Sequence, residues 1–115
     1  MAESELRISV RAAGGHPLIA LQGRLTPDCC DALRARVTEQ LAARPAKLLL
    51  ELTGLGHVSS CGVGTLLWIQ EDSRNAGCRL LVVNDNPQIR RVLELTGLDQ
   101  HFTLARTAEE ALGTP

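Results

Sequence analysis

Short apolar segments alternate along the chain with longer stretches in which apolar residues recur every three or four positions. The first segment, 6–11, alternates between apolar and polar residues, which is typical of a strand with one face in water. Gly14-Gly15 predicts a tight turn into a second strand over 18–22, so the chain should begin with a hairpin. Segment 47–52 is almost continuously apolar and indicates a strand buried inside a sheet. The remaining predicted strands cover 79–83 and 102–105.

Helical periodicity fills the intervals between the later strands. Thr26-Pro27 begins the first predicted helix, because Thr is a good N-cap and Pro suits the first helical position. A polar, glycine-rich loop is expected over 53–60. The second helix should follow over 62–76, a third from Pro87 to Gly97, and a last helical turn from Thr107. The residues expected to point inward from the second helix are Val63, Leu66, Leu67 and Ile69.

The element order ββαβαβαβα predicts an α/β fold with a mixed, mainly parallel β-sheet, an N-terminal hairpin and about four helices. A length of 115 residues and a hydrophobic content of 44% suit one globular domain. We therefore expect a single domain over 1–115, with an ordered core of about 6–112.

Composition and charge narrow the function classes. The formal net charge is −1, which argues against a domain that grips the phosphates of duplex DNA. With one Trp, one Phe and no Tyr, the chain offers few stacking platforms for single-stranded nucleic acid. We find no apolar run of about 20 residues and no signal-peptide pattern at the start, so we expect no membrane partner and a cytoplasmic protein.

The four cysteines match no metal-binding pattern. Cys29, Cys30, Cys61 and Cys78 include no C-x-x-C pair, and the three histidines are scattered. We therefore predict no metal and no cofactor. Packing is the expected role of Cys29 and Cys30, because free cysteine is among the most buried residue types.

The segment most able to carry a function is 59–64, where a buried strand gives way to the second helix. A helix N-terminus exposes unpaired N–H groups and a partial positive charge, which favour a phosphate, carboxylate or thiolate. Gly62 and Gly64 would let another backbone approach closely. A simpler interpretation, that Ser59 or Ser60 caps the helix, is compatible with a second role.

At these residues the sequence resembles the STAS domain family, in particular its anti-sigma factor antagonists. Residues 52–54 and 59–64 occupy the places of the family's Leu-Ser/Thr-Gly turn and Asp-Ser-Ser-Gly-Leu-Gly loop. Residues 23–26 resemble its Gly-Glu-Leu-Asp, and 92–98 resemble its Val-Leu-x-x-x-Gly-Leu. The order and spacing of these motifs, over almost the whole chain, carry the resemblance.

The resemblance implies an interaction protein and not an enzyme. Family members bind an anti-sigma factor that is also a serine kinase; this frees a sigma factor and regulates transcription. It implies no direct contact with nucleic acid, and leaves a monomer or a weak dimer open. The partner-binding loop that it implies consists of Thr26, Ser59, Ser60, Cys61, Gly62, Val63 and Gly64.

The chain departs from the family pattern where the kinase acts. The family's phosphorylated Ser aligns with Cys61, its loop Asp aligns with Ser59, and a second Asp aligns with Thr26. Ser60, one residue earlier, is therefore the substitute candidate for phosphorylation.

Cys61 itself is expected to be a small buried packing residue. The alternative is a redox-sensitive thiol, since helix N-termini favour thiolates, that is oxidised or bridged to Cys29 or Cys30. The alternative function is a STAS interaction module outside sigma control, a scaffold or a nucleotide- or lipid-binding domain, redox-regulated through Cys61.

Overall fold

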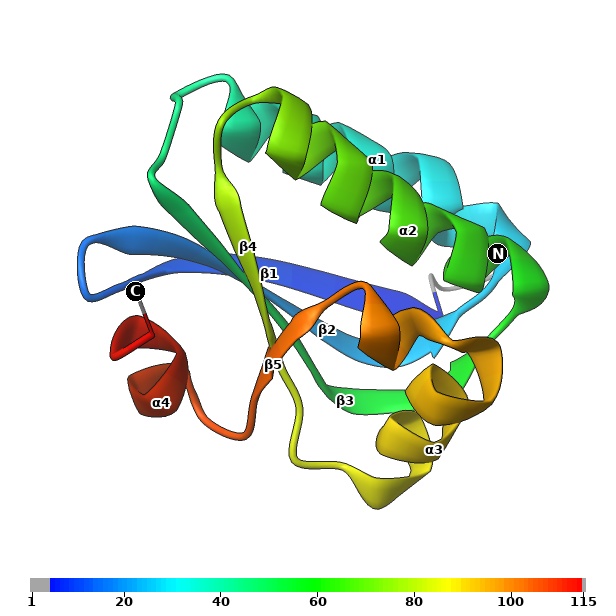
Figure 1. The fold of residues 1–115 in the computed structure, drawn as a ribbon. Helices are drawn as coiled ribbons and strands as arrows, with labels where there is room; N and C mark the ends of the chain where they lie inside the picture. Colours follow the sequence, from blue (N-terminus) through cyan, green and yellow to red (C-terminus); the bar gives the residue numbers. More distant parts are fainter. Residues whose placement is uncertain (1–4, 115) are drawn as a thin grey trace.

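Five strands form one sheet in the computed structural model, which describes residues 5–114 (Figure 1). The strands lie in the spatial order β1-β2-β3-β4-β5. Their bounds are β1 Leu6–Ala13, β2 His16–Leu25, β3 Lys47–Val58, β4 Arg79–Val83 and β5 Thr103–Ala105. The helices are α1 Pro27–Leu41, α2 Ser60–Asn75, α3 Pro87–Thr96 and α4 Ala108–Leu112, with a 3-10 turn over Leu98–Gln100.

The predicted hairpin and mixed sheet are confirmed. β1 pairs antiparallel with β2, whereas β2, β3, β4 and β5 pair in parallel. Gly14 and Gly15 make the turn with φ of +59° and +82°, a backbone conformation in which glycine carries no steric penalty. The parallel pairs place the carboxyl ends of β2, β3 and β4 at one edge of the sheet, where helices α1, α2 and α3 begin (Figure 1).

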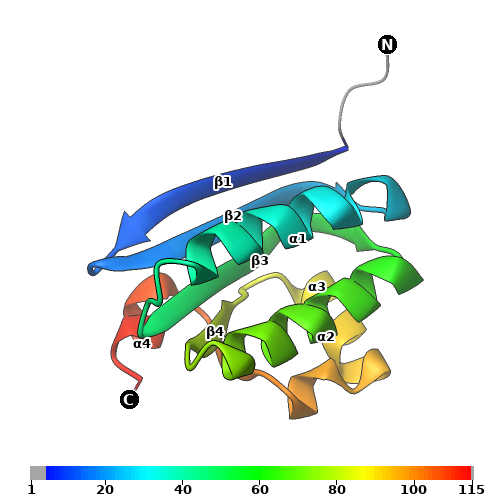
Figure 2. The same cartoon turned by 90° about the horizontal axis from the view of Figure 1, so that it is seen from above.

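Helices cover the two faces of the sheet unequally. Alternate residues of β3 face opposite sides, so Leu48 and Leu50 pack in the core beneath α1 and α2, while Leu49 packs with α4 (Figures 1 and 2). The larger core also takes Ile89 and Leu93 from α3. Burial of both faces explains why β3 is so apolar at its start.

The predicted loop over 53–60 is wrong, because β3 continues through Val58. The long partner strand β2 supplies the reason. Its last residues pair with the glycine-containing part of β3, from Gln22 opposite Gly54 to Leu25 opposite Val58, with one register shift just before Gln22 and a second within this stretch. A Cβ on Gly54 would lie only 2.8 Å from the Leu21 carbonyl oxygen, so glycine permits this close pairing. Only Ser59 then separates strand from helix.

The inward face of α2 also differs from the prediction at one position. Leu66 and Ile69 are buried as expected, but Leu67 is 37% exposed. Thr65 and Ser73 occupy the buried stripe instead, as polar residues that apolar periodicity overlooks. Among residues 5–114 there is no helix with the length and apolar character that a membrane span requires.

Candidate functional site

The β3–α2 junction is held rigidly from two sides. Ser59 is the N-cap of α2, and its hydroxyl accepts a hydrogen bond of 3.0 Å from the Gly62 N–H. The Ser59 N–H donates to the Leu25 carbonyl at 2.9 Å, which ties the start of α2 to the end of β2. The predicted cap by Ser59 is therefore confirmed, while α2 begins at Ser60, two residues before the predicted start at Gly62. The backbone and the side chain of Ser59 are both anchored.

Cys61 is exposed, so the expectation that it packs in the core is wrong. Ser60 beside it is exposed as well. In α2 the buried side begins at Gly62 and continues through Thr65, so the two preceding residues turn toward solvent. The Cys61 carbonyl accepts a hydrogen bond of 2.9 Å from the Thr65 hydroxyl, which holds the backbone of this turn in place.

The two glycines of the segment have opposite surroundings. A Cβ on Gly62 would lie 2.9 Å from both Leu25 Cγ and Val58 Cγ1, so this glycine serves internal packing and not the approach of another molecule. A Cβ on Gly64 would meet nothing within 4 Å. Gly64 therefore leaves an open, flat place on the helix surface.

The start of α1 lies beside this segment. Thr26 is half-buried, and its backbone N–H donates to Cys29 Sγ at 3.2 Å. Cys30 Sγ donates to the Thr26 carbonyl at 3.3 Å. Both cysteines are buried, at 6% and 2% exposure, so their predicted packing role is confirmed. The Leu25–Ser59 hydrogen bond brings this turn next to the α2 start, so Thr26 and 59–64 belong to one surface.

We call the exposed part of that surface the α2-start surface, and define it as Ser60, Cys61 and Gly64. Ser59, Val63 and Thr26 are half-buried at its margin, and Gly62 is buried beneath it. The first turn of α2 contains no acidic residue, so the positive end of its dipole is not offset by a carboxylate of that turn.

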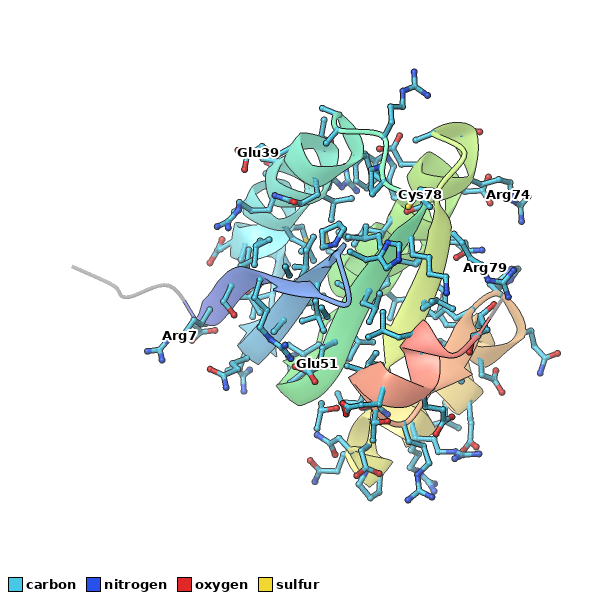
Figure 3. All side chains as sticks on the ribbon, turned by 90° about the vertical axis from the view of Figure 1, so that its left-hand side faces the viewer. Arg7, Glu39, Glu51, Arg74, Cys78 and Arg79 are labelled. Atoms are coloured by element: carbon cyan, nitrogen blue, oxygen red, sulfur yellow. The ribbon has the colours of Figure 1, made fainter. Side chains whose placement is uncertain are left out.

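Cys78 lies at the far end of α2 and takes no part in this surface. It precedes β4, and Arg74 and Arg79 lie on one side of it in Figure 3. Burial raises the pKa of its thiol above the ordinary value. A cavity of about 350 Å³ opens there, lined by these three residues together with Gln70, Gly77, Leu80 and Thr103.

Sequence reasoning missed the role of the β4–α3 junction. The Asn86 side chain accepts from the Gln88 N–H at 3.0 Å and also donates to the carbonyls of Thr53 and Leu55, at 3.1 and 3.0 Å. It therefore clamps the last part of β3 from the neighbouring junction. The Asn-Pro pair signals a helix start, but no local pattern shows that Asn86 reaches another strand.

Within residues 5–114, no cluster of three or more His, Cys, Asp or Glu side chains is arranged to hold a metal ion.

Comparisons with known proteins agree with the observed fold. The model of the STAS domain family matches residues 7–111. The anti-sigma F factor antagonist of Paenibacillus polymyxa is 27% identical over 94 residues, which cover 81% of this chain and 80% of that protein.

Two solved structures are also similar. The crystal structure of an anti-sigma factor antagonist from Mycobacterium paratuberculosis superposes with a TM-score of 0.83 and 26% identity, covering 93% of this chain and 91% of that one. The unphosphorylated form of the anti-sigma factor antagonist SpoIIAA, at 22% identity, shares the fold with a TM-score of 0.74; the match covers 92% of this chain and 93% of that one.

Proposed function

Because the chain belongs to the STAS domain family, we propose that it is an anti-sigma factor antagonist: it binds an anti-sigma factor and so releases a sigma factor for transcription. The names of its relatives support the general role. The observation that carries the proposal is the α2-start surface. A rigid, exposed turn on a helix start presents a docking site with little conformational entropy to lose on binding.

The shape of this surface suits a macromolecule better than a small ligand. Small-molecule sites are concave, whereas Ser60, Cys61 and Gly64 are exposed at a helix end. The open space over Gly64 lets a partner's backbone come close to the helix. In this proposal the chain provides the docking surface and performs no chemistry of its own.

The partner that we propose is an anti-sigma factor with serine kinase activity, and Ser60 is the acceptor that we assign to it. Cys61, which takes the place of the family's phosphoserine, has no hydroxyl, whereas the exposed Ser60 supplies one. A phosphate on Ser60 would add a charge of about −1.5 to −2 at the positive end of α2. The fold would tolerate that charge, while a partner packed on the same surface would be repelled or displaced.

Binding to the ATP-binding anti-sigma factors of the source cell tests the proposal. We expect the Gly64→Arg variant to lose at least about tenfold in affinity, because the arginine fills the space that the partner needs. Its free energy of unfolding should stay equal or rise by about 0.5–1 kcal/mol, since Gly is a poor helix residue. Gln88→Arg, which adds the same charge to the exposed first turn of α3, is the matched control and should bind normally.

Two results would contradict the proposal. Gly64→Arg that binds as tightly as the parent protein would remove the α2-start surface from the interface. Failure of the parent protein to bind any of these anti-sigma factors would instead favour a STAS interaction module outside sigma control.

Mass spectrometry after incubation of the complex with Mg²⁺ and ATP should find one phosphoryl group on Ser60, and none on the Ser60→Ala variant.

A further inference from the structure

Two cysteines from different helices meet beneath the α2-start surface. Cys61 is exposed on the first turn of α2, and Cys30 is buried, at 2% exposure, on the first turn of α1. The Leu25–Ser59 hydrogen bond sets these two helix starts side by side, and the side chains of Cys61 and Thr65 lie near enough to the Cys30 thiol to interact with it electrostatically. The two sulfurs are therefore neighbours across the α1–α2 interface, although 31 positions apart in the sequence.

The surroundings hold this pair in place without any bond between the sulfurs. The Leu25–Ser59 hydrogen bond joins the two helix starts at 2.9 Å, and Gly62 allows the first turn of α2 to pack directly on Leu25. The Thr65 hydroxyl donates to the Cys61 carbonyl at 2.9 Å, and Cys30 Sγ donates to the Thr26 carbonyl at 3.3 Å. Both backbones are thus fixed at the point where the thiols meet.

The two thiols differ in accessibility in the way that a reversible disulfide needs. Cys61 is reachable by a small oxidant, whereas Cys30 is shielded. Burial raises the pKa of the Cys30 thiol above its ordinary value, while the Thr65 hydroxyl lowers it and contact with Cys61 raises it further. Because Cys30 is shielded and Cys61 is exposed, the oxidant reaches Cys61 first.

We propose that Cys61 and Cys30 are a redox-active pair that hydrogen peroxide converts to an intramolecular disulfide. The Cys61 thiolate attacks one peroxide oxygen and breaks the O–O bond; its sulfur becomes a sulfenic acid, and the other oxygen leaves as hydroxide that is protonated to water. Cys30 then attacks the Cys61 sulfur, so that the S–S bond forms and the S–O bond breaks. The thiol proton and the released hydroxide give a second water.

The consequence for binding rests on the proposed function. Cys61 belongs to the α2-start surface, and the disulfide draws its side chain from solvent into the α1–α2 interface. The oxidised protein should therefore bind its anti-sigma factor at least about tenfold more weakly than the reduced protein. Oxidation of Cys61 would then be a second signal, beside the proposed phosphorylation of Ser60, that empties the docking surface.

Peptide mapping of the isolated full-length chain tests the disulfide without any partner. After a few equivalents of hydrogen peroxide at neutral pH, the four free thiols should fall to two, with Cys30 linked to Cys61. Dithiothreitol should restore all four. The oxidised form should also melt at a higher temperature, because the bond closes a loop of about 30 residues in the unfolded chain.

Cysteine variants supply the controls. Cys61→Ser, an exposed change that leaves the core untouched, should keep its three remaining thiols, and Cys30→Ser should form no intramolecular bond. Cys29→Ser is the matched control, because Cys29 is also buried but makes hydrogen bonds with the Thr26 N–H and the Arg24 carbonyl. This variant should form the Cys30–Cys61 disulfide as the parent protein does.

The inference would be overturned if Cys61 of the parent protein stopped at sulfenic or sulfinic acid. It would also be overturned if the Cys61→Ser variant lost as many thiols as the parent protein. Because the map needs no partner, this failure is distinct from failure of the reduced protein to bind an anti-sigma factor, which would contradict the proposed function instead.

Discussion

The β3–α2 and β4–α3 junctions are built alike and used differently. Each carries the chain from a parallel strand into a helix at the same edge of the sheet (Figure 1). Each helix has a capped N-terminus: Ser59 accepts from the Gly62 N–H and Asn86 accepts from the Gln88 N–H, both at 3.0 Å. Asn86 also donates to two carbonyls of β3, whereas the residues after Ser59 face solvent.

A capped helix start is therefore not a binding site by itself. At the β4–α3 junction the polar groups form hydrogen bonds within the fold. Besides the bonds of Asn86, the Thr53 hydroxyl accepts a hydrogen bond of 3.0 Å from the Asp85 N–H. At the β3–α2 junction the cap satisfies the helix, and the exposed hydroxyl and thiol of Ser60 and Cys61 remain for a partner. The side chains left over after capping distinguish the two junctions.

The largest loss of stability should come from adding atoms at Gly62, where the start of α2 is already tightly packed. Gly62→Val places a Cβ within 2.9 Å of two core side chains and adds two methyl groups there. We expect the free energy of unfolding, measured with urea, to fall by about 2–3 kcal/mol, as overpacked cores do. Gly64→Val, which meets open space, is the control and should not lose stability. Equal urea midpoints for the two variants would show that the α2 start is not tightly packed.

Removal of the clamp at the other junction should have the next largest effect. Asn86→Ala loses the cap of α3 and leaves the Thr53 and Leu55 carbonyls without their donor. We expect a loss of about 2 kcal/mol from one cap and two unmade hydrogen bonds, with binding of the anti-sigma factor unchanged.

Asn86→Asp tests the clamp in a second way, because a carboxylate still caps α3 but donates no hydrogen bond to β3. Its stability should lie at or below that of Asn86→Ala, because the carboxylate would also face the two carbonyls. A stability equal to that of the parent protein would show that the clamp contributes nothing.

The smallest effect should come from the cap of α2. Ser59→Ala removes one hydrogen bond to the Gly62 N–H and should lower the free energy of unfolding by about 1 kcal/mol. Ser59→Asp, which restores a cap acceptor and adds a charge at the helix N-terminus, should recover this loss. If Ser59→Ala destabilised the protein more than Asn86→Ala, the structural role that we assign to the β4–α3 junction would be reversed.

Most of the architecture was predictable from local pattern. The glycine pair between the first two strands, the apolar start of β3 and the Asn-Pro start of α3 each specify their element with neighbouring residues alone. Prediction failed where the structure depends on a distant partner. Residues 53–58 are polar and glycine-rich and resemble a loop, but the end of β2 pairs with them.

The candidate site was predictable in position but not in detail. The change from strand to helix located segment 59–64, since that change is visible in the hydrophobic period. Exposure was not visible, so Cys61 was expected inside and Gly62 outside, the reverse of what the structure shows. A residue on the first turn of a helix can face either way until the neighbouring helix and strand are placed.

Residue types within a few positions of one another specify the hairpin and the helix starts, and the order of such local signals along the chain specifies the element order and the family. The length of β3, the clamp made by Asn86 and the meeting of Cys30 with Cys61 depend instead on tertiary contacts. These three features join residues 30 or more positions apart. Their contacts depend on how the helices pack on the sheet, and a local pattern carries no information on that packing.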